Sequence, residues 1–124
     1  MIKALHHVSL LIADLDRSQK FYQEILGLSL IERPALKFEG LWFALCDDAS
    51  QQLHLLLLAE NIPQRRLPEH VGRDSHFALL VDDLPAYIDR ASKAGIAHTM
   101  SRSGRDAAFL RDPDGNGIEL IAVS

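Results

Sequence analysis

Residues 7–15 read HVSLLIADL, and residues 76–84 read HFALLVDDL. In both stretches a histidine opens an apolar, β-prone run that predicts a strand, and the run ends at aspartates able to cap a following helix. A glycine then follows each expected helix, at Gly27 and at Gly95, in the position where glycine commonly ends a helix. The sequence therefore contains an internal repeat, which constrains the fold more strongly than any single element.

Each copy of the repeat predicts the same order of elements. We expect strands at 5–13, 28–33, 41–46 and 52–58 with a helix at 17–26, and then strands at 75–81, 97–100, 107–111 and 117–123 with a helix at 86–94. This order is an α+β fold of two tandem β-α-β-β-β modules, expected to form a curved, mostly antiparallel sheet around a metal site. The single domain, 1–124, would contain modules at about 1–59 and 75–124, joined by a Pro-containing linker, 60–74, without periodicity.

Alignment of the two copies matches side chains that can bind metals. His7 falls over His76, and His54 falls over Glu119 when the final hairpins are aligned with Leu45 over Leu110. Strand alternation places His54 and Glu119 on the face opposite their apolar neighbours. A lone strand histidine is usually a hydrogen-bonded structural group, and an exposed edge position is the alternative for Glu119. Two equivalent pairs favour a divalent-metal site instead.

The ligand types limit the choice of metal. An ionised carboxylate on a covered sheet face is costly unless it is paired or bound to a cation. Imidazole and carboxylate groups suit Zn, Ni, Co, Mn or Fe, and these residues do not distinguish among the five.

A polar loop at 100–106 carries Arg102 and Arg105, which could bind an anionic substrate. Solvated surface arginines are the alternative, with at least equal weight. His70 and His98 occur in loop or edge contexts and are expected to be solvated. Aromatic strand residues are expected to be core, Trp42 and Phe109 among them.

Composition excludes several classes of protein. The chain has 48% hydrophobic and 24% charged residues and a net charge of -4, with no basic stripe that would indicate a nucleic-acid partner. Its longest apolar stretch, 55–59, is too short to span a membrane. Cys46 is the single cysteine, and the N-terminus lacks the apolar segment of a signal peptide. We expect a cytoplasmic protein without disulfides.

These motifs resemble the vicinal oxygen chelate superfamily, which includes glyoxalase I, methylmalonyl-CoA epimerase, fosfomycin-resistance thiol transferases, extradiol dioxygenases and bleomycin-binding proteins. The resemblance covers essentially the whole chain and rests on residues 7–8, 14–15, 21–22, 26–28, 76–83 and 112–120. Together these motifs are specific for the superfamily but not for one member.

The resemblance implies roles for individual residues. His7, His76 and Glu119 fall on the three recurrent metal-ligand positions of the family. His54 falls on a fourth, where glyoxalase I has glutamate and the epimerase glutamine, so this histidine departs from both patterns. Ser9 falls where the fosfomycin enzymes have a threonine, which makes it a candidate substrate-binding residue.

The implied function is a divalent-metal-dependent lyase or isomerase. It would chelate a small substrate through vicinal oxygens and stabilise an enediolate-like intermediate, with Glu119 as the candidate catalytic base. The alternatives are an Fe(II) extradiol-type dioxygenase and a metal-free small-molecule (drug) binding protein. Short members of the family usually form homodimers, and the sequence leaves open whether a metal site is built within one chain or shared between two.

Overall fold

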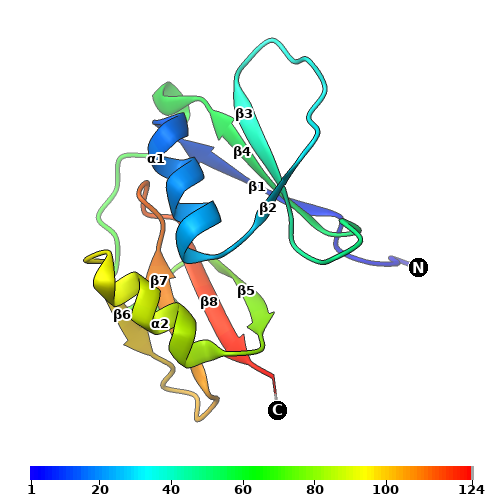
Figure 1. Ribbon diagram of the computed structural model, residues 1–124. Helices are drawn as coiled ribbons and strands as arrows, with labels where there is room; N and C mark the ends of the chain where they lie inside the picture. Colours follow the sequence, from blue (N-terminus) through cyan, green and yellow to red (C-terminus); the bar gives the residue numbers. More distant parts are fainter. Residues whose placement is uncertain (124) are drawn as a thin grey trace. The chain divides into compact units, whose positions relative to one another are not determined.

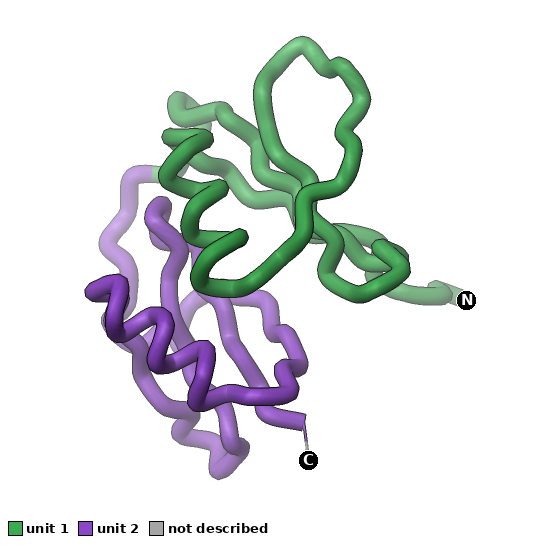
Figure 2. The backbone as a smooth tube through the Cα atoms, viewed as in Figure 1, with its two compact units in different colours: residues 1–63 green, residues 64–124 purple. Residues whose placement is uncertain are grey.

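The computed structural model of the protein describes residues 1–123, which divide after Pro63 into two compact units (Figure 2). The first unit contains β1 (His7–Ile12), α1 (Leu15–Lys20), a π-helical turn (Phe21–Ile25), β2 (Ser29–Ile31), β3 (Gly40–Ala44), β4 (Gln52–Leu57) and a 3₁₀ turn (Ala59–Asn61). Its sheet has the order β1-β4-β3-β2. The first strand runs parallel to the last, and the other neighbours are antiparallel.

The second unit repeats this topology (Figure 1). It contains a 3₁₀ turn (Val71–Arg73), β5 (His76–Val81), α2 (Leu84–Lys93), β6 (His98–Met100), β7 (Ala107–Arg111) and β8 (Gly117–Ala122), with the sheet order β5-β8-β7-β6. Strands β5 and β8 are parallel, and the remaining pairs are antiparallel. The two tandem β-α-β-β-β modules are thus confirmed.

The expected helix signals are present in both units. The side chain of Asp14 accepts a hydrogen bond from the backbone N–H of Arg17 at 2.8 Å, and Asp83 accepts one from Ala86 at 3.2 Å. Gly27 ends the first helical segment with φ of 68°, a conformation that glycine adopts without a steric penalty. The aspartate caps and the glycine stop therefore act as the repeat predicted.

The helix expected at 17–26 does not remain α-helical. Its second half is a π-helical turn, in which the backbone N–H of Leu26 bonds to the carbonyl of Phe21 at 3.3 Å. This wider turn buries two adjacent apolar pairs, Phe21 with Tyr22 and Ile25 with Leu26. Single π-helical turns of this kind occur within α-helices, and periodicity alone does not reveal them.

One face of each sheet forms the core of its unit. In the first unit the buried residues Ile12, Phe43 and Leu53 lie on this face, and Tyr22 contacts Phe43 with a ring-centroid distance of 5.9 Å. In the second unit α2 covers the equivalent face (Figure 1). The opposite face of each sheet carries the polar residues of the predicted site.

Strand register corrects one part of the repeat alignment. Trp42 pairs with His54, and Phe109 pairs with Glu119. Phe109 is therefore the equivalent of Trp42, and the expected match of Leu45 with Leu110 is wrong. The turn joining β3 to β4 is longer than the turn joining β7 to β8. The sequence alignment placed no gap in this turn, so it matched β3 with β7 out of register.

The segment expected to be an irregular linker contains both 3₁₀ turns near its ends. No helix in residues 1–123 is both long and apolar enough to cross a membrane.

Candidate functional site

His7 and His54 lie together on the sheet face of the first unit that faces away from the core. β1 and β4 place Ser9 opposite His54 and His7 opposite Gln52, so all four side chains share this face. The imidazole rings of His7 and His54 stack with a centroid distance of 4.2 Å and an interplanar angle of 18°. The structure thus brings together the two ligand candidates of this module.

Hydrogen bonding sets which nitrogen of His54 is free. Gln52 donates its side-chain N–H to the carbonyl of Ala49 at 3.1 Å, and its Oε1 then accepts a hydrogen bond from Nε2 of His54 at 2.8 Å. Nε2 therefore carries the proton, and Nδ1 retains its lone pair. A metal-binding histidine commonly has its second nitrogen held in this way.

The surroundings of His54 keep its imidazole neutral. Trp42 stacks on it in nearly parallel orientation, with ring centroids 3.9 Å apart, and His54 is only 7% exposed. Burial lowers the pKa of His54 to about 4, and the neighbouring charges of His7, His6 and Arg33 act in the same direction. The neutral form is the one that binds metals.

The rings of His6 and His7 are joined by a hydrogen bond. Their Nδ1 atoms lie 2.9 Å apart. This contact occupies Nδ1 of His7, and the tautomers of the two rings decide which of them donates.

His76 and Glu119 form the equivalent pair in the second unit. The carbonyl of Asp74 accepts a hydrogen bond from Nδ1 of His76 at 2.8 Å. Because a carbonyl can only accept, Nδ1 carries the proton in the neutral ring and Nε2 has the lone pair. Nε2 lies 3.3 Å from Oε1 of Glu119. Two electron-pair donors at this separation are suited to sharing a cation.

Glu119 is a buried carboxylate with an incompletely satisfied oxygen. The side chain is 3% exposed, and Oε2 accepts no hydrogen bond. The guanidinium of Arg105 lies 3.3 Å from Oε2, close enough to offset its charge although the hydrogen-bond geometry is not met. A buried carboxylate oxygen without a hydrogen bond costs free energy, and coordination to a metal would remove that cost. Glu119 and His76 therefore fit a divalent cation.

The two candidate pairs lie in different units. Within residues 1–123, no cluster of three or more His, Cys, Asp or Glu side chains is arranged to hold a metal ion. Each unit supplies one pair of candidate donors, fewer than the three or four protein ligands of a typical catalytic metal site. Either pair alone therefore falls short of such a ligand set.

A cavity of about 380 Å³ opens beside His76 and Glu119. It is lined by His70, Gly72, Arg73, His76, Ser101, Arg102, Ser103, Arg105, Phe109 and Glu119. Arg102 and Arg105, expected to form a substrate-binding rim, both line it and are joined by Arg73. Among the described residues, Arg73 and Arg102 form no ion pair. The cavity thus combines a candidate metal-binding pair with cationic groups free to bind an anion.

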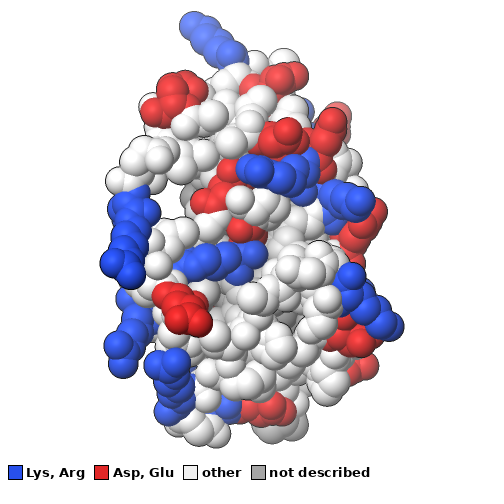
Figure 3. All heavy atoms as spheres, turned by 90° about the vertical axis from the view of Figure 1, so that its left-hand side faces the viewer, with Lys and Arg blue, Asp and Glu red and all other residues white. Residues whose placement is uncertain are grey.

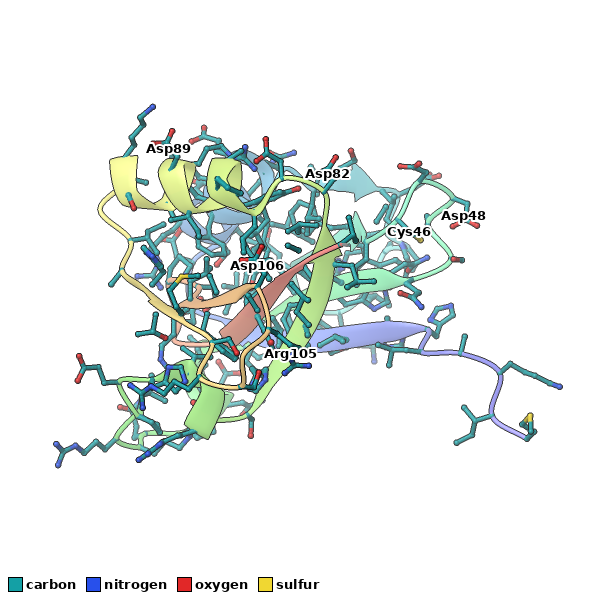
Figure 4. All side chains as sticks on the ribbon, turned by 90° about the horizontal axis from the view of Figure 1, so that it is seen from below. Cys46, Asp48, Asp82, Asp89, Arg105 and Asp106 are labelled. Carbon is teal, nitrogen blue, oxygen red and sulfur yellow. The ribbon has the colours of Figure 1, made fainter. Side chains whose placement is uncertain are left out.

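The loop between β6 and β7 orients Arg105, which Figure 4 labels beside Asp106. The hydroxyls of Ser101 and Ser103 lie 2.8 Å apart, and Ser103 accepts a hydrogen bond from Nε of Arg105 at 3.3 Å. The terminal nitrogen of Arg105 then points to Glu119. Figure 3 shows basic and acidic side chains interspersed on the face that it draws.

His70 was expected to be solvated, and this expectation is wrong. The residue is 9% exposed, its Nδ1 lies 2.7 Å from the hydroxyl of Thr99, and its ring packs edge-on against Phe109. Burial lowers the pKa of His70, and the charges of Arg102, Arg73 and His76 lower it further. A histidine in a loop of polar residues gives no periodic signal, and its burial becomes visible only through its contacts with Thr99 of β6 and Phe109 of β7.

Two aromatic residues were missed as site residues because strand aromatics were assigned to the core. Trp42 stacks on His54, and Phe109 lies edge-on to His76 at a centroid distance of 5.2 Å. Correct alignment of the hairpins would have shown both aromatics opposite a candidate ligand. Cys46 is exposed in the turn between β3 and β4, beside Asp48 (Figure 4).

Asp74 holds together the segments that surround the cavity. Its carboxylate accepts hydrogen bonds from Arg65 at 2.8 and 3.0 Å and from Arg111 at 2.8 Å. These bonds, with the Arg65 contact contributing most, lower the pKa of Asp74 to about 2. Arg111 also donates to the carbonyls of Gly115 and Pro68 at 2.7 and 2.6 Å. The segment that positions His76 is thereby fixed to the β7–β8 hairpin.

Known proteins with similar sequences include several enzymes. Lactoylglutathione lyase from Haemophilus influenzae is 33% identical over 93% of this chain and 89% of its own length. Glyoxylase I 4 from Arabidopsis thaliana is 30% identical over 96% of this chain and 70% of its own length. Catechol-2,3-dioxygenase from Bacillus subtilis is 34% identical over 94% of this chain but only 40% of its own length. The relatives therefore span more than one reaction type.

Solved structures show the same fold. TnmS3, an antibiotic binding protein from Streptomyces sp. CB03234, superposes with a TM-score of 0.75 and 25% identity, over 99% of this chain and 98% of the other. A protein assigned to the glyoxalase family from Bacillus anthracis gives a TM-score of 0.74 at 22% identity, over 100% and 98% of the two chains. The model of one family matches residues 4–120. The chain belongs to the glyoxalase/bleomycin resistance protein/dioxygenase superfamily.

Proposed function

We propose that the protein is a divalent-metal-dependent enzyme that binds a small substrate through two neighbouring oxygens, with lyase or isomerase chemistry. The observation that carries this proposal is the geometry of His76 and Glu119. Nε2 of the histidine faces Oε1 of a buried carboxylate, whose other oxygen accepts no hydrogen bond. The matched pair in the first unit, His7 and His54, supports the same assignment.

We assign the metal to four residues: His7, His54, His76 and Glu119. His54 would bind through Nδ1 and His76 through Nε2, because a hydrogen bond holds the other nitrogen in each ring. A divalent ion among Zn, Ni, Co, Mn and Fe suits this set, and when bound it supplies Lewis acidity to the substrate oxygens.

The remaining site residues act on the substrate directly. Arg102 and Arg105 bind its anionic group from one side of the cavity. Glu119 is the catalytic base, since its carboxylate is buried and borders the same cavity. Ser9 lies exposed on the face that carries His54 and contributes a substrate hydrogen bond. We further propose a homodimer, which light scattering on the purified chain would test.

Metal uptake tests the assignment without knowledge of the substrate. Protein purified without chelator should contain about one divalent ion per chain by elemental analysis. His76→Ala and Glu119→Gln should each reduce this content severely, whereas His98→Ala, which removes a half-buried histidine outside the site, should not. Circular dichroism would confirm that each variant is folded. Less than about a tenth of an equivalent in the wild type, with no tight rebinding, would refute the proposal.

A metal-free binding protein is the second candidate, favoured by the similarity to the antibiotic binding protein TnmS3. In that case the cavity would bind its ligand equally well before and after chelator treatment. An Fe(II) dioxygenase is the enzymatic alternative, favoured by the 34% identity to catechol-2,3-dioxygenase. Oxygen consumption by the iron-loaded protein with catechols would identify it.

A further inference from the structure

The cavity of the second unit contains a buried histidine that has no place in the metal-ligand set. His70 directly precedes the 3₁₀ turn Val71–Arg73 and is held on two sides. Its Nδ1 bonds to the hydroxyl of Thr99, and Phe109 packs against its ring. Among the described residues no hydrogen bond reaches its Nε2. The ring is therefore fixed, with one polar atom left for a ligand.

Gly72 keeps the space beside that atom open. A Cβ at residue 72 would lie 2.7 Å from Nε2 of His70 and 3.3 Å from Cζ of Phe109. Cβ atoms in proteins do not approach another atom as closely as 2.7 Å, so any residue larger than glycine would displace the imidazole of His70 or cover its Nε2. Gly72 also lines the cavity with His70. The backbone thus leaves access to Nε2 from the cavity.

The charges around His70 indicate what kind of ligand it meets. Arg73, Arg102 and Arg105 line the same cavity, and Glu119, its acidic lining residue, is already accompanied by Arg105. Two guanidinium groups remain without an ion pair in the described part of the chain. An oxyanion entering here would find several donors and no uncompensated negative charge.

We propose that His70 is a substrate-binding residue, which donates a hydrogen bond from Nε2 to an oxyanion, a carboxylate or a phosphoryl group, held by Arg73 and Arg102. In this arrangement the Thr99 hydroxyl donates to Nδ1 and so selects the tautomer with a proton on Nε2. His70 acts in its neutral form, because burial and the adjacent guanidinium groups disfavour the imidazolium. The inference deepens the proposed function, since it concerns the same cavity.

The test uses the full chain after chelator treatment, with inorganic phosphate and acetate as probes. Nitrogen-detected NMR should show that phosphate, acetate or both shift the Nε2 resonance of His70 in a saturable way. Binding of phosphate alone would indicate a phosphoryl substrate, and binding of acetate alone a carboxylate. Failure of both anions to bind, or saturable binding that leaves the His70 resonance unchanged, would overturn the inference.

Five variants, one of them a control, separate a binding role from a structural one. His70→Gln and Gly72→Ala should weaken anion binding about tenfold or more, the usual cost of losing a hydrogen bond to a charged group. Thr99→Val should weaken it and shift the tautomer signal, and Thr99→Ser should restore both. His98→Gln, whose neighbour along β6 is Thr99 but whose side chain lies on the other sheet face, is the matched control. Unchanged affinity in His70→Gln would also overturn the inference.

Metal content distinguishes this inference from the proposed function. His70→Gln should take up the same amount of metal as the wild type. If the wild type binds no metal but retains anion binding that depends on His70, the enzyme proposal fails and the inference stands. If metal binds normally and the anions do not, the inference fails alone.

Discussion

Asp74 gives a prediction whose size follows from the structure. Replacing it with asparagine keeps the side-chain shape and the backbone carbonyl that accepts from His76, but removes the charge that Arg65 and Arg111 contact. The pKa of this carboxyl falls from 3.8 to about 2 on folding. Since each pKa unit corresponds to about 1.4 kcal/mol, the ionised group stabilises the fold by about 2 kcal/mol at neutral pH.

The stabilisation by ionised Asp74 should depend on pH in a definite direction. A carboxyl with a depressed pKa contributes its full stability above its unfolded value of 3.8 and loses it as the pH falls toward about 2. Urea unfolding at pH 7 should therefore show Asp74→Asn to be less stable by about 2 kcal/mol. The difference between the two proteins should narrow steadily below pH 4.

The two arginines should not contribute equally. The Arg65 contact lowers the pKa of Asp74 most, but Arg65 is 48% exposed. Solvent screening should therefore limit the cost of replacing it with methionine to less than about 1 kcal/mol, as for most surface ion pairs. Arg111 is 18% exposed and also binds two backbone carbonyls, so Arg111→Met should cost more than Asp74→Asn. A wild-type-like stability for Asp74→Asn at pH 7, or a difference that persists unchanged in acid, would refute this reasoning.

Three further predictions follow from single contacts. In metal-free protein, the free energy of unfolding should fall by about 3 kcal/mol as the pH is lowered from 6.5 to 4, because folding lowers the pKa of His54 to about 4. Urea unfolding across this pH range should show the fall in the wild type and not in His54→Gln. Trp42, the single tryptophan, stacks on His54, so its fluorescence should change on metal addition and not in His54→Ala. Asp112 accepts hydrogen bonds from the backbone of Asp114 and Asn116, so Asp112→Ala should destabilise the protein by about 2 kcal/mol, measured as a lower Tm in calorimetry.

The repeat allowed most of the fold to be predicted from sequence. Strand β7 agrees with the expected 107–111, and the other strands differ from expectation by a few residues at their ends. The sequence offered Asp14 or Asp16 as one cap and Asp82-Asp83 as the other, and Asp14 and Asp83 make the capping bonds. Such caps can be recognised because capping depends on a side chain and backbone groups only three residues away. Local interactions of this kind are encoded over short stretches, so a single sequence reveals them.

The composition of the candidate site was predicted less completely. His76, Glu119, Arg102 and Arg105 were named from residue type and repeat position, and the structure places all four on one cavity. His70 was missed, because its burial depends on contacts with strands far along the chain.

By itself the sequence determined the two modules, the helix caps and the equivalence of His7 with His76 and of His54 with Glu119. Strand periodicity and helix capping reveal these features in the sequence, because both depend on residues only a few positions apart. Only the tertiary structure decided which nitrogen of each histidine is free, which aromatic faces each ligand candidate, and that His70 is buried with its Nε2 open. Those properties arise from hydrogen bonds and ring contacts between strands and loops distant in sequence, whose register depends on turn lengths that residue patterns do not specify.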